Sequence, residues 1–282
     1  MTDQAPANAD QLAYWNDAAG ETWAELQDEL DRQLEPLGEV TMAALAPNAG
    51  DRLLDIGCGT GQTTLALAAR VGPQGAVLGV DISQPMLEIA RRRVASMRLP
   101  QAQFLAADAQ THPFEPDALD GVFSRFGVMF FADPPAAFAN IRKGLKSGGR
   151  LAFVCWRPAE ENPWMRPSTG AAFVDLPPAP PPEPGAPGPF GFADPERVRA
   201  ILSGAGFADI EISTHDQEIG GNSLEDTVKL ALRVGPLGAL LREHPDRRDA
   251  VVSQLRKGFA ARERDGRVWQ DSATWIVTAR NL

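Results

Sequence analysis

Residues 53–61 read Leu53-Leu54-Asp55-Ile56-Gly57-Cys58-Gly59-Thr60-Gly61, and the next apolar run closes with Val80-Asp81. An apolar strand, a glycine-rich turn, a helix, a second strand and a terminal carboxylate follow one another here. Glycines let a turn adopt positive φ and let backbone N–H groups approach a ligand, while an acidic side chain one βα unit later can accept both ribose hydroxyls. The stretch therefore predicts a pocket for a nucleoside cofactor.

Short apolar runs alternate with helical stretches on the C-terminal side of this motif. The predicted strands are 53–56, 76–80, 103–106, 119–124 and 150–155, and the predicted helices are 61–70, 84–97 and 134–146. Asp133 before Pro134 and Asp194 before Pro195 are typical N-caps, and Gly148-Gly149 and Gly206 are predicted helix stops. This alternation is typical of an α/β fold whose parallel sheet is covered on both faces.

Both flanks of this core differ from it. A helix over 23–37 carries apolar residues at helical spacing, which predicts an N-terminal helical lid over residues 1–48. The core occupies 49–156, and residues 157–282 add acceptor-side insertions, a strand at 208–214, a capping box at Ser223 and Asp226, and a last strand at 274–279. The proline-rich segment 177–189 is either a connector or a border of the substrate pocket.

The composition narrows the classes of partner. The formal net charge is -10, so no excess of basic residues points to nucleic acid or to an anionic membrane. The basic run Arg91–Arg93 fits a solvated helix face better than a binding patch. Cys58 and Cys155 have neither a disulfide pattern nor metal-ligand spacing, so we expect no metal and a reducing, cytoplasmic location. We expect a soluble protein with a small-molecule partner, and the oligomeric state stays open.

The neighbours of the glycine turn separate the candidate cofactors. Asp55 stands where it can meet an ammonium group, whereas a dinucleotide would bring a pyrophosphate that this carboxylate repels. The alternative for Asp55 is a structural carboxylate that caps the turn. The spacing Gly57-x-Gly59-x-Gly61 is tighter than the dinucleotide fingerprint. The one tyrosine, Tyr14, precedes the sheet, so hydride chemistry has no visible catalytic residue.

With these motifs the chain resembles a class I S-adenosylmethionine-dependent methyltransferase of the bacterial small-molecule type, similar to those of ubiquinone and menaquinone biosynthesis. The resemblance covers about residues 41–156. It is carried by residues 53–61, 79–83, 107–109, 120–127 and 136–149. It implies a Rossmann-like, doubly wound, mostly parallel seven-stranded sheet, with S-adenosylmethionine as cofactor and S-adenosylhomocysteine as product.

The resemblance also implies a role for each matching residue. Asp55 and the backbone of Gly57, Gly59 and Gly61 would hold the methionine part, and Asp81 would take the ribose hydroxyls. Ile82 and Met86 would flank the adenine, Asp108 and Ala109 would bind its edge, and Ser124 and Phe126 would lie near the sulfonium. Tyr14, Trp15 and Trp23 either close the methionine end, where an aromatic face suits a sulfonium, or pack as an ordinary core.

No residue is assigned a catalytic role. Positioning alone suffices for an in-line methyl transfer, and His112, His215 and His244 each fit a structural or surface role better. Arg125 either anchors a carboxylate of a ligand or pairs with a nearby acid. Trp156, Trp164, Met165, Phe190 and Phe192 are candidates for an apolar acceptor pocket or for core. Methylation of a small metabolite is the leading hypothesis; cofactor binding without turnover and nicotinamide-dependent oxidoreduction are the alternatives.

Overall fold

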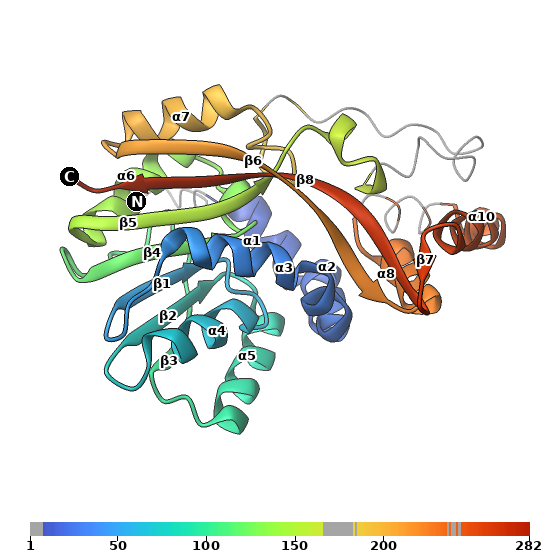
Figure 1. Ribbon diagram of the computed structural model, residues 1–282, viewed down its shortest axis with the longest axis horizontal. Coiled ribbons are helices and arrows are strands. Elements are labelled where there is room, and N and C mark those ends of the chain that lie inside the picture. The colour runs from blue at the N-terminus through green and yellow to red at the C-terminus, as the bar shows by residue number, and fades with distance from the viewer. Residues whose placement is uncertain (1–7, 166–182, 184, 236, 238–240, 242–243) are drawn as a thin grey trace, which may run out of the picture.

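A computed structural model describes residues 8–165, 183, 185–235, 237, 241 and 244–282. Its strands form one sheet in the order β3-β2-β1-β4-β5-β8-β6 (Figure 1). Five neighbouring strands pair in parallel: β1 (Arg52–Ile56), β2 (Ala76–Asp81), β3 (Ala102–Ala106), β4 (Leu119–Arg125) and β5 (Leu145–Trp156). β8 (Arg267–Arg280) runs antiparallel between β5 and β6 (Ala208–Asn222). The predicted doubly wound, mostly parallel seven-stranded sheet is confirmed, and the two-residue strand β7 (Glu263–Arg264) pairs beside β8.

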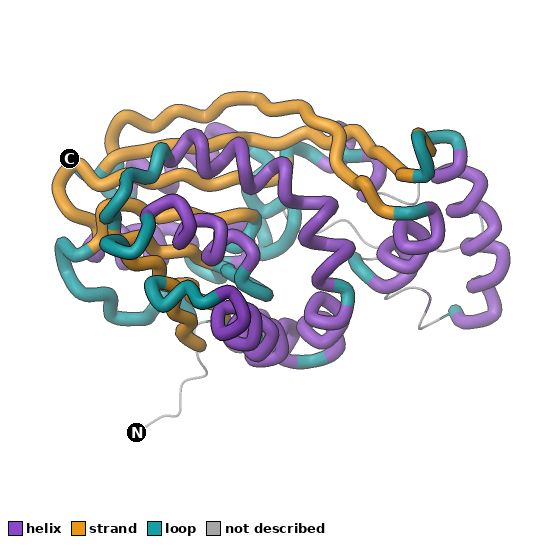
Figure 2. Tube along the Cα trace, turned by 60° about the horizontal axis from the view of Figure 1, so that its bottom comes forward, coloured by secondary structure: helices purple, strands orange, loops and turns teal. Residues whose placement is uncertain are grey.

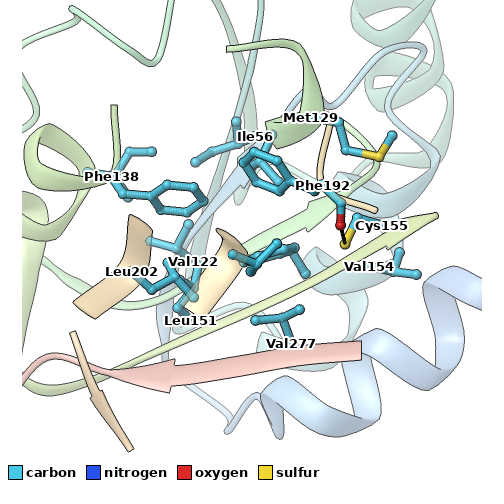
Figure 3. Packing of buried hydrophobic residues seen from close by; sticks show 14 of the residues in the cluster. Ile56, Val122, Met129, Phe138, Leu151, Val154, Cys155, Phe192, Leu202 and Val277 are labelled. Atoms are coloured by element: carbon cyan, nitrogen blue, oxygen red, sulfur yellow. Dashed lines mark hydrogen bonds between the residues drawn. The ribbon is translucent and has the colours of Figure 1, made fainter. Parts of the chain in front are cut away.

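Helices cover both faces of this sheet. On one face, α3 (Gln27–Leu45) and α4 (Gln62–Val71) bury apolar side chains against β1 and β2, and α5 (Gln84–Met97) packs beside β3. On the other face lie α6 (Pro134–Gly144) and α7 (Pro195–Gly204). Figure 3 shows their core, in which Phe138 and Leu202 meet Val122, Leu151 and other strand residues.

The strand order reverses between β1 and β4, and two glycines make this point possible. A Cβ on Gly57 would lie 2.6 Å from the Cα of Gly127, and a Cβ on Gly127 would lie 2.6 Å from the carbonyl oxygen of Ile56. Real Cβ atoms do not approach backbone so closely. The turns that follow β1 and β4 therefore touch backbone to backbone, at the point where α/β sheets of this kind bind their ligands.

Most predicted helix boundaries are confirmed by the capping bonds. Asp133 accepts a hydrogen bond from Ala136 N (3.0 Å), and Asp194 accepts one from Glu196 N (2.9 Å). Ser223 caps α8 (Leu224–Arg233) by accepting from Asp226 N (3.1 Å). Gly206 follows the end of α7 at φ +90°.

One predicted boundary is wrong. The helix expected over 134–146 ends at Gly144, because Leu145 is fully buried and pairs with Leu119 as the first residue of β5. The pairing then shifts register between Leu119 and Gly121, and Gly148-Gly149 lies in β5 rather than at a helix end. Strand pairing with distant residues overrides the local helical pattern here.

β6 and β8 are much longer than the predicted strands 208–214 and 274–279. They pair as far as Asn222 and Val268, and beyond β5 they form a two-stranded arm that leads to α8 and α10 (Arg248–Ala260). Figure 1 and Figure 2 both show this arm passing beyond the rest of the sheet. Its helices have an apolar cluster of their own, which includes Val228, Leu232 and Val251.

The N-terminal segment is helical as predicted, but it forms three helices, α1 (Ala9–Asn16), α2 (Ala18–Glu25) and α3. Leu26 and Leu30 pack against Leu230 of α8, so the α2–α3 junction rests on the arm. Arg233 pairs with Glu25 (2.6 Å) and Lys229 pairs with Glu29 (3.1 Å) across the same contact.

No helix within the described ranges combines the length and the apolar character needed to cross a bilayer. Most of the predicted proline-rich segment, 177–182 and 184, lies outside the described residues.

The contact between the two glycines is testable by substitution. In Gly57→Ala the added methyl group meets backbone at a φ of +68°, so we expect a loss of about 2–5 kcal/mol of unfolding free energy. Gly50→Ala is the matched control: its φ is +86°, but a Cβ there meets nothing within 4 Å, so only backbone strain of about 1–2 kcal/mol remains. Denaturant unfolding without ligand measures both, and equal losses would contradict the close approach.

Candidate functional site

A cavity opens at the carboxyl ends of β1 to β4, beside the strand-order reversal. Its space, counted out to the open mouth and including the solvent there, is about 960 Å³. Its wall comes from the turns after the four strands, from β4 and from the N-terminal helices. The lining residues are Asn8, Trp15, Trp23, Gln27, Leu30, Asp31, Leu34, Ile56, Gly57, Cys58, Gly59, Thr60, Val80, Asp81, Ile82, Met86, Ala107, Asp108, Ala109, Arg125, Phe126, Gly127, Phe130 and Phe131.

The glycine turn is fixed to the end of β2. Gly57 N and Cys58 N both donate to the carbonyl of Val80 (2.9 and 3.2 Å), and Gly57, Gly59 and Gly61 have φ values of +68°, +53° and +87°. Gly57 and Gly59 line the cavity, but Gly61 does not. A Cβ on Gly61 would lie 2.8 Å from the ring of Phe104, so this glycine allows α4 to start close to β3.

Asp81 is shaped as a hydrogen-bond acceptor on the cavity wall. One carboxylate oxygen accepts from Gly59 N (2.7 Å) and the other from Ser83 N (2.8 Å). An ionised carboxylate has about four lone-pair sites, so these two bonds leave acceptor capacity toward the cavity. Burial raises the pKa of Asp81, and the backbone N–H bonds from Ser83 and Gly59 oppose that rise.

Asp55 occupies a different environment from the one predicted for it. Asp55 is 0% exposed and does not line the cavity. Its Oδ2 accepts hydrogen bonds from the hydroxyls of Thr63 (2.7 Å) and Thr64 (2.6 Å). Burial raises its pKa to about 6, against the two threonine hydroxyls, which lower it. The carboxylate therefore lies behind the turn, where it holds the first turn of α4.

The residues predicted for the adenine side are brought together. Asp108 and Ala109 lie after β3, and Ile82 and Met86 lie after β2; all four line the cavity. Asp108 Oδ1 accepts from Gln110 N (2.9 Å), which fixes the turn after β3.

The two residues predicted at the end of β4, Ser124 and Phe126, have different surroundings. Ser124 does not line the cavity; its hydroxyl donates to Ile56 O (2.8 Å) and accepts from Gly127 N (3.1 Å), so it ties the two touching turns together. Phe126 does line the cavity, at an unusual φ of +66°. Its ring stacks on Trp156 with centroids 4.1 Å apart and planes 9° apart, which supports this rare conformation.

Aromatic side chains from the N-terminal helices and from Phe130 form another part of the wall. Trp15 meets Trp23 edge-on at 5.7 Å and Phe130 at 5.2 Å between ring centroids. Asn16 fixes α1 in place, because its amide donates to Ile82 O (2.8 Å) and accepts from Gln84 N (2.9 Å). Tyr14 is 52% exposed and does not line the cavity.

Several lining residues were not predicted from the sequence. Asp31, Leu30 and Leu34 belong to α3, where they look like ordinary positions of an amphipathic helix. Phe130 and Phe131 directly follow the predicted motif 120–127, and this proximity was a usable signal. Conversely, Trp156, Trp164, Met165, Phe190 and Phe192 do not line the cavity and pack in or against the core.

The titratable residues among the lining set are Asp31, Cys58, Asp81, Asp108 and Arg125; it contains no histidine, lysine, glutamate or tyrosine. Burial raises the pKa of Cys58 well above its ordinary value, which keeps the thiol protonated. His112 lies outside this set, with its ring edge-on to Phe114. Among the described wall residues, the side chains able to accept a proton are therefore the carboxylates of Asp31, Asp81 and Asp108.

Arg93 departs from the expectation of a solvated basic run. It is partly buried, and its guanidinium pairs with Asp31 at 2.7 Å and donates to Thr60 O at 3.1 Å, while Arg91 and Arg92 are exposed. The last arginine of the run therefore belongs to the structure beside the cavity.

Comparison with known proteins agrees with this geometry. Residues 53–149 match the family model described as "Methyltransferase domain". A demethylmenaquinone methyltransferase of Symbiobacterium thermophilum is 43% identical over 107 residues, which are 38% of this chain and 42% of that protein. Aklanonic acid methyltransferase DauC of Streptomyces sp. (strain C5) is 36% identical over 119 residues, 42% of this chain and 54% of that protein. The match thus spans about half of each relative.

Solved structures share the fold at low sequence identity. A SAM-dependent methyltransferase from Aquifex aeolicus superimposes with a TM-score of 0.52 at 20% identity, over 71% of this chain and 92% of that one. The [4+2]-cyclase SpnF superimposes with a TM-score of 0.55 at 21% identity, over 87% of this chain and 80% of that one. At these identities the likeness concerns the fold alone.

The buried Asp55 gives stability a defined pH dependence. Its pKa is about 6 when folded against 3.8 as the ordinary value, so its contribution is present below pH 3.8 and is lost as the pH rises through about 6. We expect the unfolding free energy of the wild type, relative to Asp55→Asn, to fall by about 1.4 kcal/mol between roughly pH 5 and 8.

Asp120→Asn serves as the control, because Asp120 has a lowered pKa and is fully ionised across that interval. Its unfolding free energy is expected to run parallel to that of the wild type. Urea unfolding at several pH values measures these differences, and a parallel course for Asp55→Asn as well would contradict the raised pKa.

Proposed function

We propose that this chain, whose residues 53–149 belong to the class I S-adenosylmethionine-dependent methyltransferase family, transfers a methyl group to a small-molecule acceptor. One observation carries the proposal: four neighbouring strand ends present, in spatial order, the groups that an adenosyl amino acid requires. The order is Asp108 after β3, Asp81 at the end of β2, Gly57 and Gly59 after β1, and the end of β4.

The residues fit the cofactor part by part. Asp108 and Ala109 would bind the adenine edge, with Ile82 and Met86 on either side of the ring. Asp81 would accept from the ribose hydroxyls with the lone pairs that Gly59 N and Ser83 N leave free. Gly57 and Gly59 would let the amino acid part approach the backbone, since neither has a side chain in its way.

Bound S-adenosylmethionine supplies an activated methyl group on a sulfonium. The chain's own contribution is positioning and exclusion of water, which can provide roughly 7–11 kcal/mol of barrier reduction. Trp15, Trp23 and Phe126 are the candidates for the wall near the sulfonium, where an aromatic face attracts a soft cation. Because aspartates are the only candidate bases on the described wall, we infer that the acceptor brings a nucleophile that needs little deprotonation by the protein.

For the acceptor we propose a planar aromatic metabolite. The relatives are named for demethylmenaquinone and aklanonic acid, and the aromatic side chains of Trp15, Trp23, Phe130 and Phe131 offer apolar surface for such a ring. In this division of labour residues 1–48 close the cavity, 49–156 hold the cofactor, and 157–282 border the acceptor side. We propose a cytoplasmic enzyme with no nucleic acid or membrane partner.

Cofactor binding without turnover is the second candidate, because a fold and a binding site do not by themselves establish an activity. A direct assay separates the two. The purified chain is incubated with methyl-labelled S-adenosylmethionine and a set of hydroxylated naphthoquinols and anthraquinones, and labelled product is followed by mass spectrometry. Labelled acceptor supports the methyltransferase; binding of S-adenosylhomocysteine without any labelled product supports the second candidate; binding of NAD(H) instead contradicts both.

The role of Asp81 is testable by ligand affinity. Asp81→Ala removes a hydrogen-bonded charged acceptor, so we expect S-adenosylhomocysteine binding to weaken by about 1.5–3 kcal/mol in calorimetry. Asp120→Ala is the control: this carboxylate also accepts a backbone N–H, from Arg52 at 2.9 Å, but it lies at the opposite end of β4. Unchanged affinity in folded Asp81→Ala would refute the ribose assignment.

The aromatic lid yields a separate prediction. Trp15→Ala removes a ring that contacts both Trp23 and Phe130, so we expect S-adenosylhomocysteine affinity to fall by roughly tenfold, or about 1.4 kcal/mol. Tyr14→Ala, on the same helix but facing solvent, should leave the affinity nearly unchanged. Comparable losses in the two variants would show that α1 acts through its helix and not through the Trp15 ring.

A further inference from the structure

Two opposite charges lie on the cavity wall near the end of β4. Asp31 comes from α3 and Arg125 from β4; their side chains are 12% and 14% exposed, and both line the cavity. Asp31 Oδ1 lies 4.0 Å from Arg125 Nη2, which is the outer limit of an ion pair and too long for a hydrogen bond. The two groups face each other without direct hydrogen bonding.

Their other partners leave each of them incompletely satisfied. Asp31 Oδ2 receives Arg93 Nη1 at 2.7 Å, while Oδ1 has only the distant Arg125 within the described chain. Among the described residues Arg125 donates one hydrogen bond, from Nη1 to Gln62 Oε1 (2.6 Å), although a guanidinium has five N–H donors. Burial raises the pKa of Asp31 and lowers that of Arg125. Desolvation is thus the largest influence on each group.

The residue predicted from the sequence to meet the ammonium group lies behind the cavity wall, and only one of its two carboxylate oxygens has a hydrogen-bond partner in the described chain. Asp55 is fully buried, does not line the cavity and holds the hydroxyls of Thr63 and Thr64. Of the aspartates that do line the cavity, Asp81 lies at the end of β2 and Asp108 lies after β3, toward the adenosine end. Asp31 is therefore the lining carboxylate beside the end of β4.

Resting on the proposed function, we propose that Asp31 and Arg125 together hold the zwitterionic tail of the cofactor. Asp31 takes the α-ammonium and Arg125 takes the α-carboxylate, so that the tail completes the loose ion pair between α3 and β4. A planar guanidinium recognises a carboxylate in two-point fashion, and an ammonium group offers a partly buried carboxylate hydrogen bonds and an opposite charge in place of the water it has lost. Gly38 supports this arrangement, since a Cβ there would lie 3.4 Å from Arg125 Cδ.

The competing explanation is purely structural: the pair fastens α3 to the sheet. Ligands that differ only in the tail distinguish the two explanations. S-adenosylhomocysteine carries both charged groups, its decarboxylated analogue lacks the carboxylate, and 5′-methylthioadenosine lacks the whole amino acid. Calorimetry with the full chain measures the three affinities, and thermal unfolding checks that each variant is folded.

We expect Asp31→Asn and Arg125→Gln each to weaken S-adenosylhomocysteine by roughly tenfold to a hundredfold, and to leave 5′-methylthioadenosine within about twofold of the wild type. Arg125→Gln should not weaken the decarboxylated analogue, whereas Asp31→Asn should. Arg125→Lys should recover part of the lost affinity because it restores the charge without the fork.

Glu39→Gln and Arg70→Gln are matched controls, because Glu39 and Arg70 form an ion pair between α3 and α4 and neither lines the cofactor cavity. Each should leave all three affinities within about twofold. Unchanged S-adenosylhomocysteine binding in both site variants, or a parallel loss of 5′-methylthioadenosine, would overturn the tail assignment. A wild-type chain that binds neither nucleoside would instead overturn the proposed function itself.

Discussion

The close approach of Gly57 and Gly127 is the constraint on which the site depends. Because no side chain separates the turns after β1 and β4, the strand-order reversal closes tightly, and Ser124 joins the two turns through its hydroxyl. The glycine turn can then reach the end of β2, where Asp81 receives Gly59 N. The absence of side chains at Gly57 and Gly127 thus fixes where the turn after β1 borders the cavity.

The tight packing also sets the protonation behaviour of the carboxylates at the site. Carboxylates at the strand ends are withdrawn from water, so burial raises the pKa of Asp31, Asp55 and Asp81 alike. Hydrogen-bond partners offset the free-energy cost of burying each carboxylate, and these partners differ. They are hydroxyls for Asp55, backbone N–H groups for Asp81 and arginines for Asp31. The partners, more than the residue type, separate a structural carboxylate from one that a ligand can use.

Much of the fold and part of the site follow from local sequence signals. The alternation of strands and helices, the caps at Asp133 and Asp194 and the cavity positions of Asp81 and Asp108 depend on residues close together in the chain. The sequence did not predict the burial of Asp55 behind its turn, where the hydroxyls of Thr63 and Thr64 donate to its Oδ2. Asp31 and the length of β6 and β8 escaped prediction because pairing over long sequence separations decides them.

The arm formed by β6 and β8 brings the C-terminal helix α8 into contact with the N-terminal helices. α8 contacts the α2–α3 junction, which lies beside the cavity. The contact consists of Leu230 and of two ion pairs, Arg233 with Glu25 and Lys229 with Glu29. If the α2–α3 junction moved away from the sheet, α8 would have to move with it, or these contacts would have to break. Solvent-accessible ion pairs are weak, typically below about 1 kcal/mol each, so the buried leucines Leu26, Leu30 and Leu230 provide most of the strength of this contact.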